Sequence, residues 1–315
     1  MASGAKAKVQ SKSGFDEATK GKLLLVLLAF CWGLSWPALR IALDEISPWT
    51  TRFLGYCIGA SALILLLKLQ GRSFTIPFGR NWIHVFIAGM LNVVAFGLFG
   101  TFAQLSTATT RVIIINYSMP IWASILAWLI LRERPNAWVG AGLALCIAGL
   151  STLVYPVAAA SLQEPTGLIL AFFCALSWAA GTIYMKAVRI EGDLLAITMW
   201  QIVVGVIVFG IGMLIVQGPP SFEPLQLRTW LGVAWSGLLG TALAYFIWYN
   251  IIGKVSTATA SLGTLANPVI GVIGSMILLG ERLTVTDIVG FALIFAAAAC
   301  VLLQPTRQAT GGRIS

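Results

Sequence analysis

Long apolar stretches alternate with short polar ones along the chain. A membrane-spanning helix needs about 20 mainly apolar residues, and ten stretches qualify. Only the connections 70–81 and 217–227, which contain proline and polar residues, are long enough to form loops. The pattern predicts an all-α polytopic membrane protein with ten transmembrane helices. Numbered in chain order, the predicted spans are 23–43, 51–69, 82–103, 108–131, 136–155, 166–186, 194–216, 228–251, 255–279 and 286–303.

The composition agrees with burial in lipid. Of 315 residues, 58% are hydrophobic and only 10% are charged, whereas soluble domains carry about 25% charged residues. Most of the chain therefore cannot face water, and the alternative of a soluble helical bundle is strongly disfavoured. The lipid bilayer is the expected surrounding. The five cysteines all fall in spans and are interpreted as small apolar side chains.

The basic residues are distributed unevenly between the two sides of the predicted membrane. Ten spans place both termini on the same side, and 15 of the 20 Lys and Arg residues fall on that side. Cytoplasmic loops are enriched in Lys and Arg, so we predict cytoplasmic tails at 1–22 and 304–315. The net charge of +9 is thus explained by topology, and no nucleic-acid partner is expected.

The two halves of the chain resemble each other. In the fourth span Pro120 is followed thirteen residues later by Glu133-Arg134, and in the ninth span Pro268 is followed at the same distance by Glu281-Arg282. The sequences STATTRV at 106–112 and STATASL at 256–262 open the same two spans. We therefore predict a first five-helix repeat at 23–155 and a second at 156–303.

Tryptophans match between these halves as well. Trp32 and Trp178 are 146 residues apart, and Trp82 and Trp230 are 148 residues apart. Because five spans are an odd number, the second repeat must be inverted relative to the first. Inverted repeats around a central site are a recurrent design of secondary transporters.

Several kinds of chemistry are missing from the sequence. All eleven Asp and Glu residues lie in tails, loops or span ends, which argues against a proton relay through a carboxylate in the membrane. No GxSxG, HExxH or GxxxxGK[ST] motif is present. We expect no catalytic activity, no metal site and no cofactor, and ATP-driven transport by this chain alone is excluded.

Charged and titratable groups are few near the middle of the spans. No Lys or Arg lies near mid-span, so a clamp for phosphate esters is not expected. Arg111, one turn into the fourth span, is the nearest candidate; it either snorkels to the interface or contacts a carboxylate at a cavity mouth. The only histidine, His84, is expected at the interface, with proton handling as the alternative.

Uncharged polar and aromatic residues recur at helical spacing on six spans, so each set shares one helix face. Taken singly, each has an ordinary role as an interfacial aromatic or an interhelical hydrogen-bond partner. Together they favour a polar cavity, because mid-span amides would otherwise lie in hydrocarbon. The candidate substrate-binding residues are Trp32, Ser35, Trp36, Asn92, Phe96, Asn116, Tyr117, Trp178, Thr182, Tyr245, Thr264 and Asn267.

Prolines and glycines predict where helices bend and where they touch. Pro120 and Pro268 each remove a backbone hydrogen bond, which is tolerable only beside protein or water, and both are candidate hinges. Glycines in spans allow helices to approach closely. We expect such contacts at Gly140, Gly149, Gly271 and Gly274.

The sequence resembles the EamA family of the drug/metabolite transporter superfamily. LILRERP at 129–135 and LLGERL at 278–283 occupy the place of that family's glycine-glutamate-arginine-leucine signature, although Arg132 replaces the glycine in the first copy. With NYSMPIW at 116–122 and the tryptophan-rich first span, the chain looks most like bacterial YddG-type exporters of aromatic amino acids. The resemblance implies a central cavity lined by spans one, three, four, six, eight and nine.

These observations lead to one expected function and its alternatives. We expect a bacterial inner-membrane exporter of neutral, including aromatic, amino acids, working as a monomer by alternating access. Asn, Ser and Thr groups would bind the carboxylate, and aromatic faces would attract the ammonium group. Export of drugs or other small metabolites by the same fold is the alternative. A membrane enzyme or receptor is disfavoured, because no catalytic motif or large extramembrane domain is present.

Overall fold

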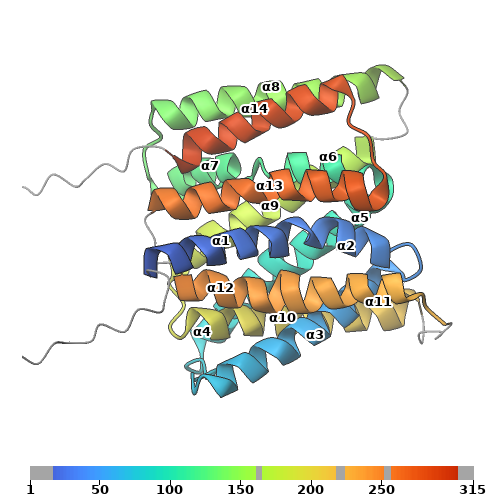
Figure 1. Ribbon diagram of the computed structural model, residues 1–315. Coiled ribbons are helices and arrows are strands. Elements are labelled where there is room, and N and C mark those ends of the chain that lie inside the picture. Colours follow the sequence, from blue (N-terminus) through green and yellow to red (C-terminus); the bar gives the residue numbers. More distant parts are fainter. Residues whose placement is uncertain (1–16, 161–164, 218–223, 252–256, 304–315) are drawn as a thin grey trace, which may run out of the picture.

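A computed structural model of the protein describes residues 17–160, 165–217, 224–251 and 257–303. These residues form helices joined by short connections, without strands (Figure 1). The elements are α1 (Glu17–Gly33), α2 (Ser35–Ala42), α3 (Pro48–Leu69), α4 (Arg80–Gly89), η1 (Met90–Ala95), α5 (Phe96–Ser106), α6 (Thr109–Asn116), α7 (Met119–Leu131), α8 (Ala137–Ala160), α9 (Pro165–Val188), α10 (Leu194–Val216), α11 (Leu227–Ala234), η2 (Trp235–Leu243), α12 (Ala244–Ile251), α13 (Thr257–Leu279) and α14 (Val285–Leu302).

The prediction of a polytopic helical membrane protein is confirmed. Within the described residues, nine helical stretches are long and apolar enough to cross a membrane, and their ends lie within three residues of the predicted ones. Helix α13 occupies the place of the ninth predicted span, and its apolar part is Gly263–Leu279. Residues 1–16 and 304–315 of the predicted tails, and the start of the ninth span, lie outside the described residues.

Four spans consist of more than one helical element. The first span changes from α1 to α2 at Leu34, and the fourth changes from α6 to α7 at Tyr117–Ser118. The third and eighth spans are continuous, but each contains a π-helical segment, η1 or η2, between two α-helices. These irregular places lie within the spans and not at their ends.

Short polar sequences fix where several helices begin. The Ser47 side chain accepts a hydrogen bond from the Thr50 amide at the start of α3, and Pro48 is the first residue of that helix. Asp193 accepts from two backbone amides at the start of α10. Thr284 and Asp287 form a capping box at the start of α14. The predicted spans, which were drawn from the apolar stretches, begin zero to three residues after these capped helix starts.

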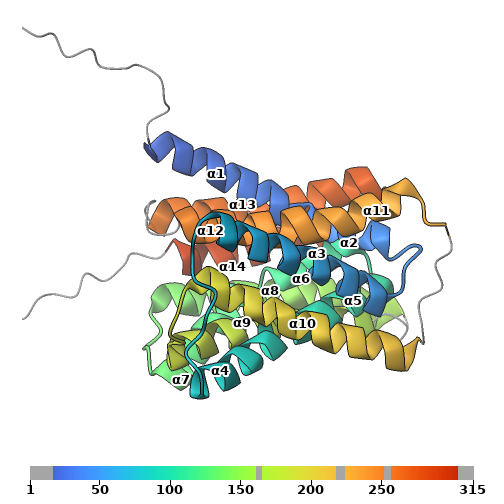
Figure 2. The same cartoon turned by 90° about the horizontal axis from the view of Figure 1, so that it is seen from below.

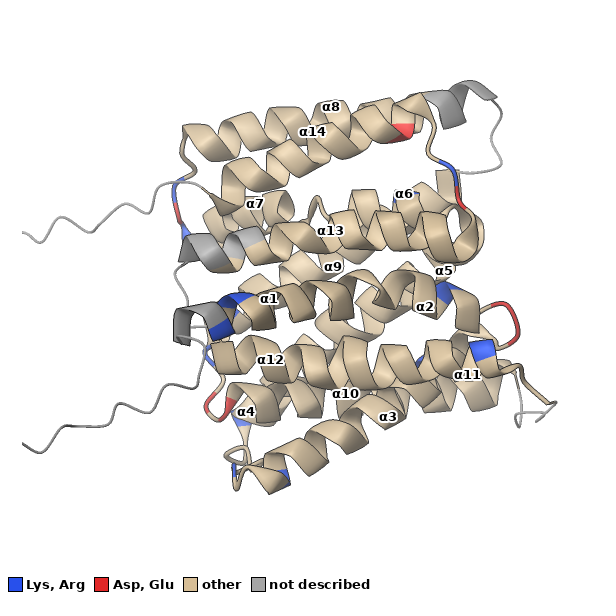
Figure 3. Ribbon diagram, viewed as in Figure 1, with Lys and Arg blue, Asp and Glu red and all other residues tan. Residues whose placement is uncertain are grey.

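The helices run side by side along one axis (Figures 1 and 2). Helix α8 packs against α14 at one edge of the bundle, and α3 packs against α10 toward the other. Helix α1 contacts α13, and α9 contacts both α5 and α7. Helix α1 begins and α14 ends at the same end of the bundle, and charged residues gather at the two ends (Figure 3). Which end faces the cytoplasm stays a prediction.

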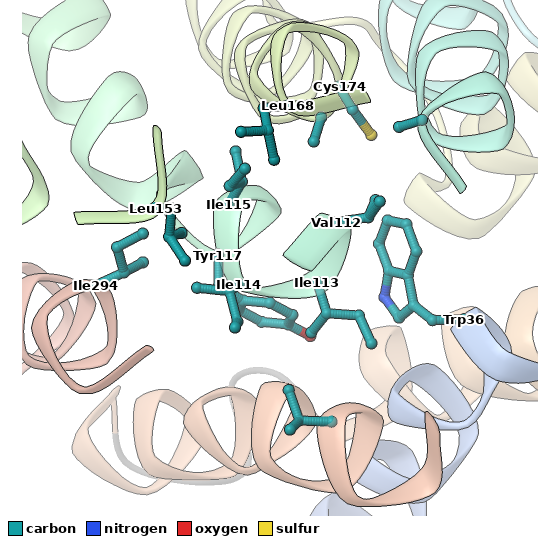
Figure 4. Packing of buried hydrophobic residues seen from close by; sticks show 13 residues of the cluster. Trp36, Val112, Ile113, Ile114, Ile115, Tyr117, Leu153, Leu168, Cys174 and Ile294 are labelled. Atoms are coloured by element: carbon teal, nitrogen blue, oxygen red, sulfur yellow. The ribbon is translucent and has the colours of Figure 1, made fainter. Parts of the chain in front are cut away.

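One large apolar cluster surrounds α6. The four consecutive residues Val112–Ile115 are at most 1% exposed, so this part of α6 is buried on every side, as a stretch that is apolar all round requires. Figure 4 shows their side chains directed toward different neighbours, including Leu168, Ile294 and Trp36. Trp36 therefore belongs to this core as well as to the cavity described below.

Glycines bring some helices into close contact, but not all the predicted ones do so. A Cβ added at Gly149 would lie 3.1 Å from the Gly290 carbonyl of α14, and one at Gly271 would lie 3.1 Å from the Gly33 carbonyl of α1. Gly274 faces Leu34 closely. The prediction for Gly140 was wrong, because nothing lies within 4 Å of its Cβ position. Gly142, half a turn further, makes the contact with α14 instead.

The two candidate hinge prolines have different surroundings. Pro120 is the second residue of α7, directly after the break between α6 and α7. Pro268 lies inside α13, which continues through it without interruption. The break near Pro120 is thus a structural fact, whereas motion at either proline stays a prediction.

Candidate functional site

A cavity of about 520 Å³ lies in the middle of the bundle. Eight of the spans contribute to its wall, whereas no described residue of α8 or α14 does. Ligand pockets for small molecules typically measure about 300–1,000 Å³. The cavity is therefore large enough for a small organic substrate and too small for a macromolecule.

The residues singled out from the sequence meet at this cavity. Each of the twelve lies on the wall, although they come from six different spans and are up to 235 positions apart. Binding of a substrate by them stays a prediction. They are Trp32, Ser35, Trp36, Asn92, Phe96, Asn116, Tyr117, Trp178, Thr182, Tyr245, Thr264 and Asn267.

Sequence reasoning missed two further walls. Helix α3 contributes Arg52 and Tyr56, and α10 contributes Thr198, Gln201 and Ile202. The set of six lining spans implied by the family resemblance is therefore incomplete. A signal was present on α3, because Arg52 and Tyr56 lie four residues apart and share one helix face. The sequence signal on α10 was weaker, since its polar residues are embedded in a strongly apolar stretch.

Asn92 is held on the wall by a polar neighbour. Its Nδ2 donates to Oε1 of Gln201 at 3.1 Å, and both side chains are buried. Gly181 of α9 leaves the room for this amide, because a Cβ there would overlap the Asn92 side chain. The Oδ1 atom of Asn92 has no hydrogen-bond partner among the described residues.

Two more buried amides have the same property. Asn116 and Asn267 are 3% and 4% exposed, and their Oδ1 atoms also have no partner within the described part of the chain. Asn116 lies at the end of α6, and Asn267 lies directly before Pro268 in α13. A buried amide oxygen without a partner is costly, and the three residues line one cavity. Each of these oxygens is itself buried, and that of Asn92 lies against Gly181, so a ligand donor reaches them only when the side chains turn toward the cavity.

Aromatic rings cover much of the remaining wall in two groups. Trp32 packs against Tyr245 and Trp248, with ring centroids 6.0 and 5.8 Å apart. Phe96 packs between Trp36 and Trp178, at centroid distances of 6.0 and 4.9 Å. Such faces accept apolar and aromatic groups and attract cations.

Arg52 introduces a positive charge that the sequence interpretation did not expect in the cavity. Its Nε donates to Oγ1 of Thr101 at 2.5 Å, and that hydroxyl donates in turn to the Gly97 carbonyl at 2.6 Å. Its Cζ lies 5.8 Å from the centroid of the Tyr56 ring. No described carboxylate lies within ion-pair distance of Arg52.

The π-helical segments form part of the wall. Asn92 and Val93 come from η1, and Ser236, Gly240 and Thr241 come from η2. In η2 the Thr241 hydroxyl donates to the carbonyl five residues earlier, at 2.8 Å. π-Helical turns often occur at functional sites because they change the direction of side chains within a helix. They lie in the third and eighth spans, which the predicted repeats would pair; the repeat itself stays a prediction.

Arg111 and His84 lie elsewhere. Arg111 is not on the cavity wall, and its Nε donates to Oδ1 of Asp287 at 2.8 Å. The carboxylate it contacts is thus in the protein. Nδ1 of His84 lies 2.7 Å from the Tyr184 hydroxyl, also away from the cavity wall. No group of three or more metal-ligating side chains occurs in the ranges that the structure describes.

A family model with the description "EamA-like transporter family" matches residues 19–155 and again residues 165–303. The protein belongs to the EamA-like transporter family. The family resemblance noted in the sequence is thereby confirmed, and the protein is a multi-pass membrane transporter. The model matches each half once, in agreement with the internal similarity of the sequence.

Relatives of similar length match most of the chain. "Uncharacterized transporter YoaV" of Bacillus subtilis is 22% identical over 87% of this chain and 94% of its own. A "Probable amino-acid metabolite efflux pump" of Salmonella typhimurium is 24% identical over 88% and 93%, and one of Escherichia coli is 23% identical over 87% and 92%. A solved crystal structure with 18% identity covers 92% of this chain and 100% of its own at a TM-score of 0.61, which supports the fold.

Proposed function

We propose that this protein exports neutral amino acids, including aromatic ones, across a bacterial inner membrane by alternating access. The observation that carries the proposal is the set of three unpartnered amide oxygens, from Asn92, Asn116 and Asn267, on one aromatic-lined cavity. An ammonium group has three N–H donors and no acceptor. Three acceptors in a site without a described carboxylate suit an ammonium group that belongs to a zwitterion.

The aromatic wall supports the same substrate class. Trp and Tyr faces attract an ammonium group by roughly 0.5–2 kcal/mol. The rings of Phe96 and Trp178 also offer an apolar surface for the side chain of the substrate. Relatives named as amino-acid metabolite efflux pumps agree with the proposal.

The alternative is export of drugs or other small metabolites through the same cavity. A wall with several indole rings suits lipophilic cations, which are common among exported drugs. However, the described cavity wall has no carboxylate to balance a cation, and it contains Arg52. We therefore favour amino acids over lipophilic cations.

A flux assay in proteoliposomes tests the proposal. The full-length protein should carry radiolabelled phenylalanine or leucine down a gradient, and Trp36→Ala and Asn116→Ala should each reduce the rate severalfold or more. Trp138→Ala is the matched control, because Trp138 lies on α8 away from the cavity and is 49% exposed. Drug flux without flux of any amino acid would overturn the proposal.

A further inference from the structure

Arg52 is a positively charged side chain on the wall of a cavity within a membrane protein. A charged side chain in a membrane span is costly and marks a functional site unless the protein pairs it. Four of the described carboxylates form ion pairs with other residues: Asp44 with Arg40, Glu133 with Lys186, Asp193 with Arg72, and Asp287 with Arg111. Glu45 and Glu281 instead accept hydrogen bonds at the starts of α11 and α6. None of these ion pairs reaches Arg52, so its charge has no anionic partner among the described residues.

The guanidinium group is held in a fixed place. Thr101 is 1% exposed and accepts the Nε–H of Arg52, while its own hydroxyl proton goes to the Gly97 carbonyl. Thr101 uses one of the five N–H donors of Arg52, and the guanidinium group also hydrogen-bonds the Tyr56 side chain. The remaining donors of the terminal amino groups can bind a ligand. Gly100 lies beside them, because a Cβ there would be 3.7 Å from Nη2 and 3.6 Å from the Trp36 ring.

The other half of the chain shows that the helix contact itself does not need this charge. Thr198 follows Arg52 by the same 146 residues that separate Trp32 from Trp178, and Tyr249 follows Thr101 by the same 148 residues that separate Trp82 from Trp230. The Thr198 hydroxyl donates to the Tyr249 hydroxyl at 2.9 Å and joins α10 to α12, as Arg52 joins α3 to α5. Two neutral hydroxyls therefore fill the corresponding place.

We propose that Arg52 binds the carboxylate of the transported substrate, which makes a free carboxylate a requirement for tight binding. This inference rests on the proposed function and specifies it. An arginine fork matches the two oxygens of a carboxylate, whereas the amide oxygens of Asn92, Asn116 and Asn267 suit the ammonium group. The site then prefers amino acids over the corresponding amines and amides, and it disfavours lipophilic cations.

Binding of phenylalanine and of phenylalaninamide to the purified full-length protein tests the inference. The two ligands share the ring and the ammonium group, but the amide lacks the negative charge. The unsubstituted protein should bind phenylalanine about tenfold or more tightly than the amide, because a charge-assisted pair is lost in the amide. In Arg52→Gln this ratio should fall toward one, mainly through weaker binding of phenylalanine, and Arg52→Lys should keep part of it.

Two further variants complete the experiment. Arg40→Gln removes an arginine that pairs with Asp44 outside the cavity wall, and its ratio should equal that of the unsubstituted protein. Thr101→Val keeps the charge but removes the acceptor that positions it, so it should lower the ratio even if Arg52→Gln fails to fold. If the ratio of the two affinities were unchanged in both Arg52→Gln and Thr101→Val, this inference would be overturned, but the proposed function would still stand. If the unsubstituted protein bound no neutral amino acid, the proposed function would fail, and this inference with it.

Discussion

Glu281 caps a helix that is far from it in sequence. Its two carboxylate oxygens accept hydrogen bonds from the backbone amides of Thr109 and Thr110, at 2.7 and 2.8 Å. These amides are the first of α6, where unpaired N–H groups and the helix dipole favour a negative charge. The Glu-Arg motif after the ninth span therefore fastens the fourth span, which carries Asn116 to the cavity.

Glu281→Gln should lower the melting temperature of the protein in detergent. Glutamine offers one acceptor oxygen, so its amino group would face one of the two helix amides. Loss of a charged cap should cost about 1–2 kcal/mol. Glu133→Gln is the control, because Glu133 forms an exposed pair with Lys186, a kind of pair worth about 0–1 kcal/mol. Equal melting temperatures for the two variants would show that the cap contributes little.

Asp287→Asn should destabilise the protein more than Asp44→Asn does. The Asp287 side chain is 4% exposed, pairs with Arg111 and also caps α14. Removing one partner of a buried ion pair costs about 3–5 kcal/mol, whereas the Arg40–Asp44 pair is exposed and should contribute about 0–1 kcal/mol. Denaturant titration in detergent measures both, and a smaller loss in Asp287→Asn than in Asp44→Asn would contradict the expectation.

Gly181→Ala should weaken substrate binding while the fold is kept. The added methyl group would displace the Asn92 side chain and break its hydrogen bond to Gln201. A lost hydrogen bond of about 1 kcal/mol raises the dissociation constant about fivefold. The matched control is Gly140→Ala, where the methyl group meets nothing within 4 Å. Identical dissociation constants for both variants would show that the position of the Asn92 side chain does not affect substrate binding.

Gly33→Ala should destabilise the bundle itself. Its Cβ would lie 2.8 Å from the backbone oxygen of Asn267 and 2.9 Å from the Ile270 side chain, where α1 meets α13. A backbone atom cannot move aside as a flexible side chain does, so overpacking should cost about 1–3 kcal/mol. Thermal unfolding followed by size-exclusion chromatography should show a lower midpoint for Gly33→Ala than for Gly140→Ala. A midpoint equal to or above that of Gly140→Ala would mean that α1 and α13 move apart to accommodate the methyl group at little cost.

The membrane architecture was predictable because its causes are local. About 20 apolar residues in a row specify a spanning helix, and caps such as Ser47 and Asp193 fix the ends. The aromatic face of the first span was also readable, since Trp32 and Trp36 lie one turn apart. The same spacing argument selected twelve residues that the fold brings to one cavity.

What escaped prediction depends on contacts between helices. Arg52 lies only four residues after the start of α3, so the sequence predicted a place at the membrane interface. Its contacts with Thr101 and Tyr56, which belong to the folded structure, place it on the cavity wall. The local sequence does not distinguish Gly140 from Gly142. Only the position of α14 decides which of the two lies in a close helix contact. The π-helical segments are invisible to any test that assumes 3.6 residues per turn.

Those π-helical segments also affect where the chain tolerates a change of length. A hydrogen bond in η1 or η2 encloses one residue more than an α-helical one, so losing a residue there can be absorbed by closing the turn to regular α-helix. The contacts of α4 with α10 and of α5 with α9 would then keep their register. A deletion in the uninterrupted helix α3 cannot be absorbed in this way, because every later side chain would rotate by about 100° around the helix axis. The two segments beside the cavity are therefore places in the membrane spans where we expect this transporter to lose a residue and remain assembled.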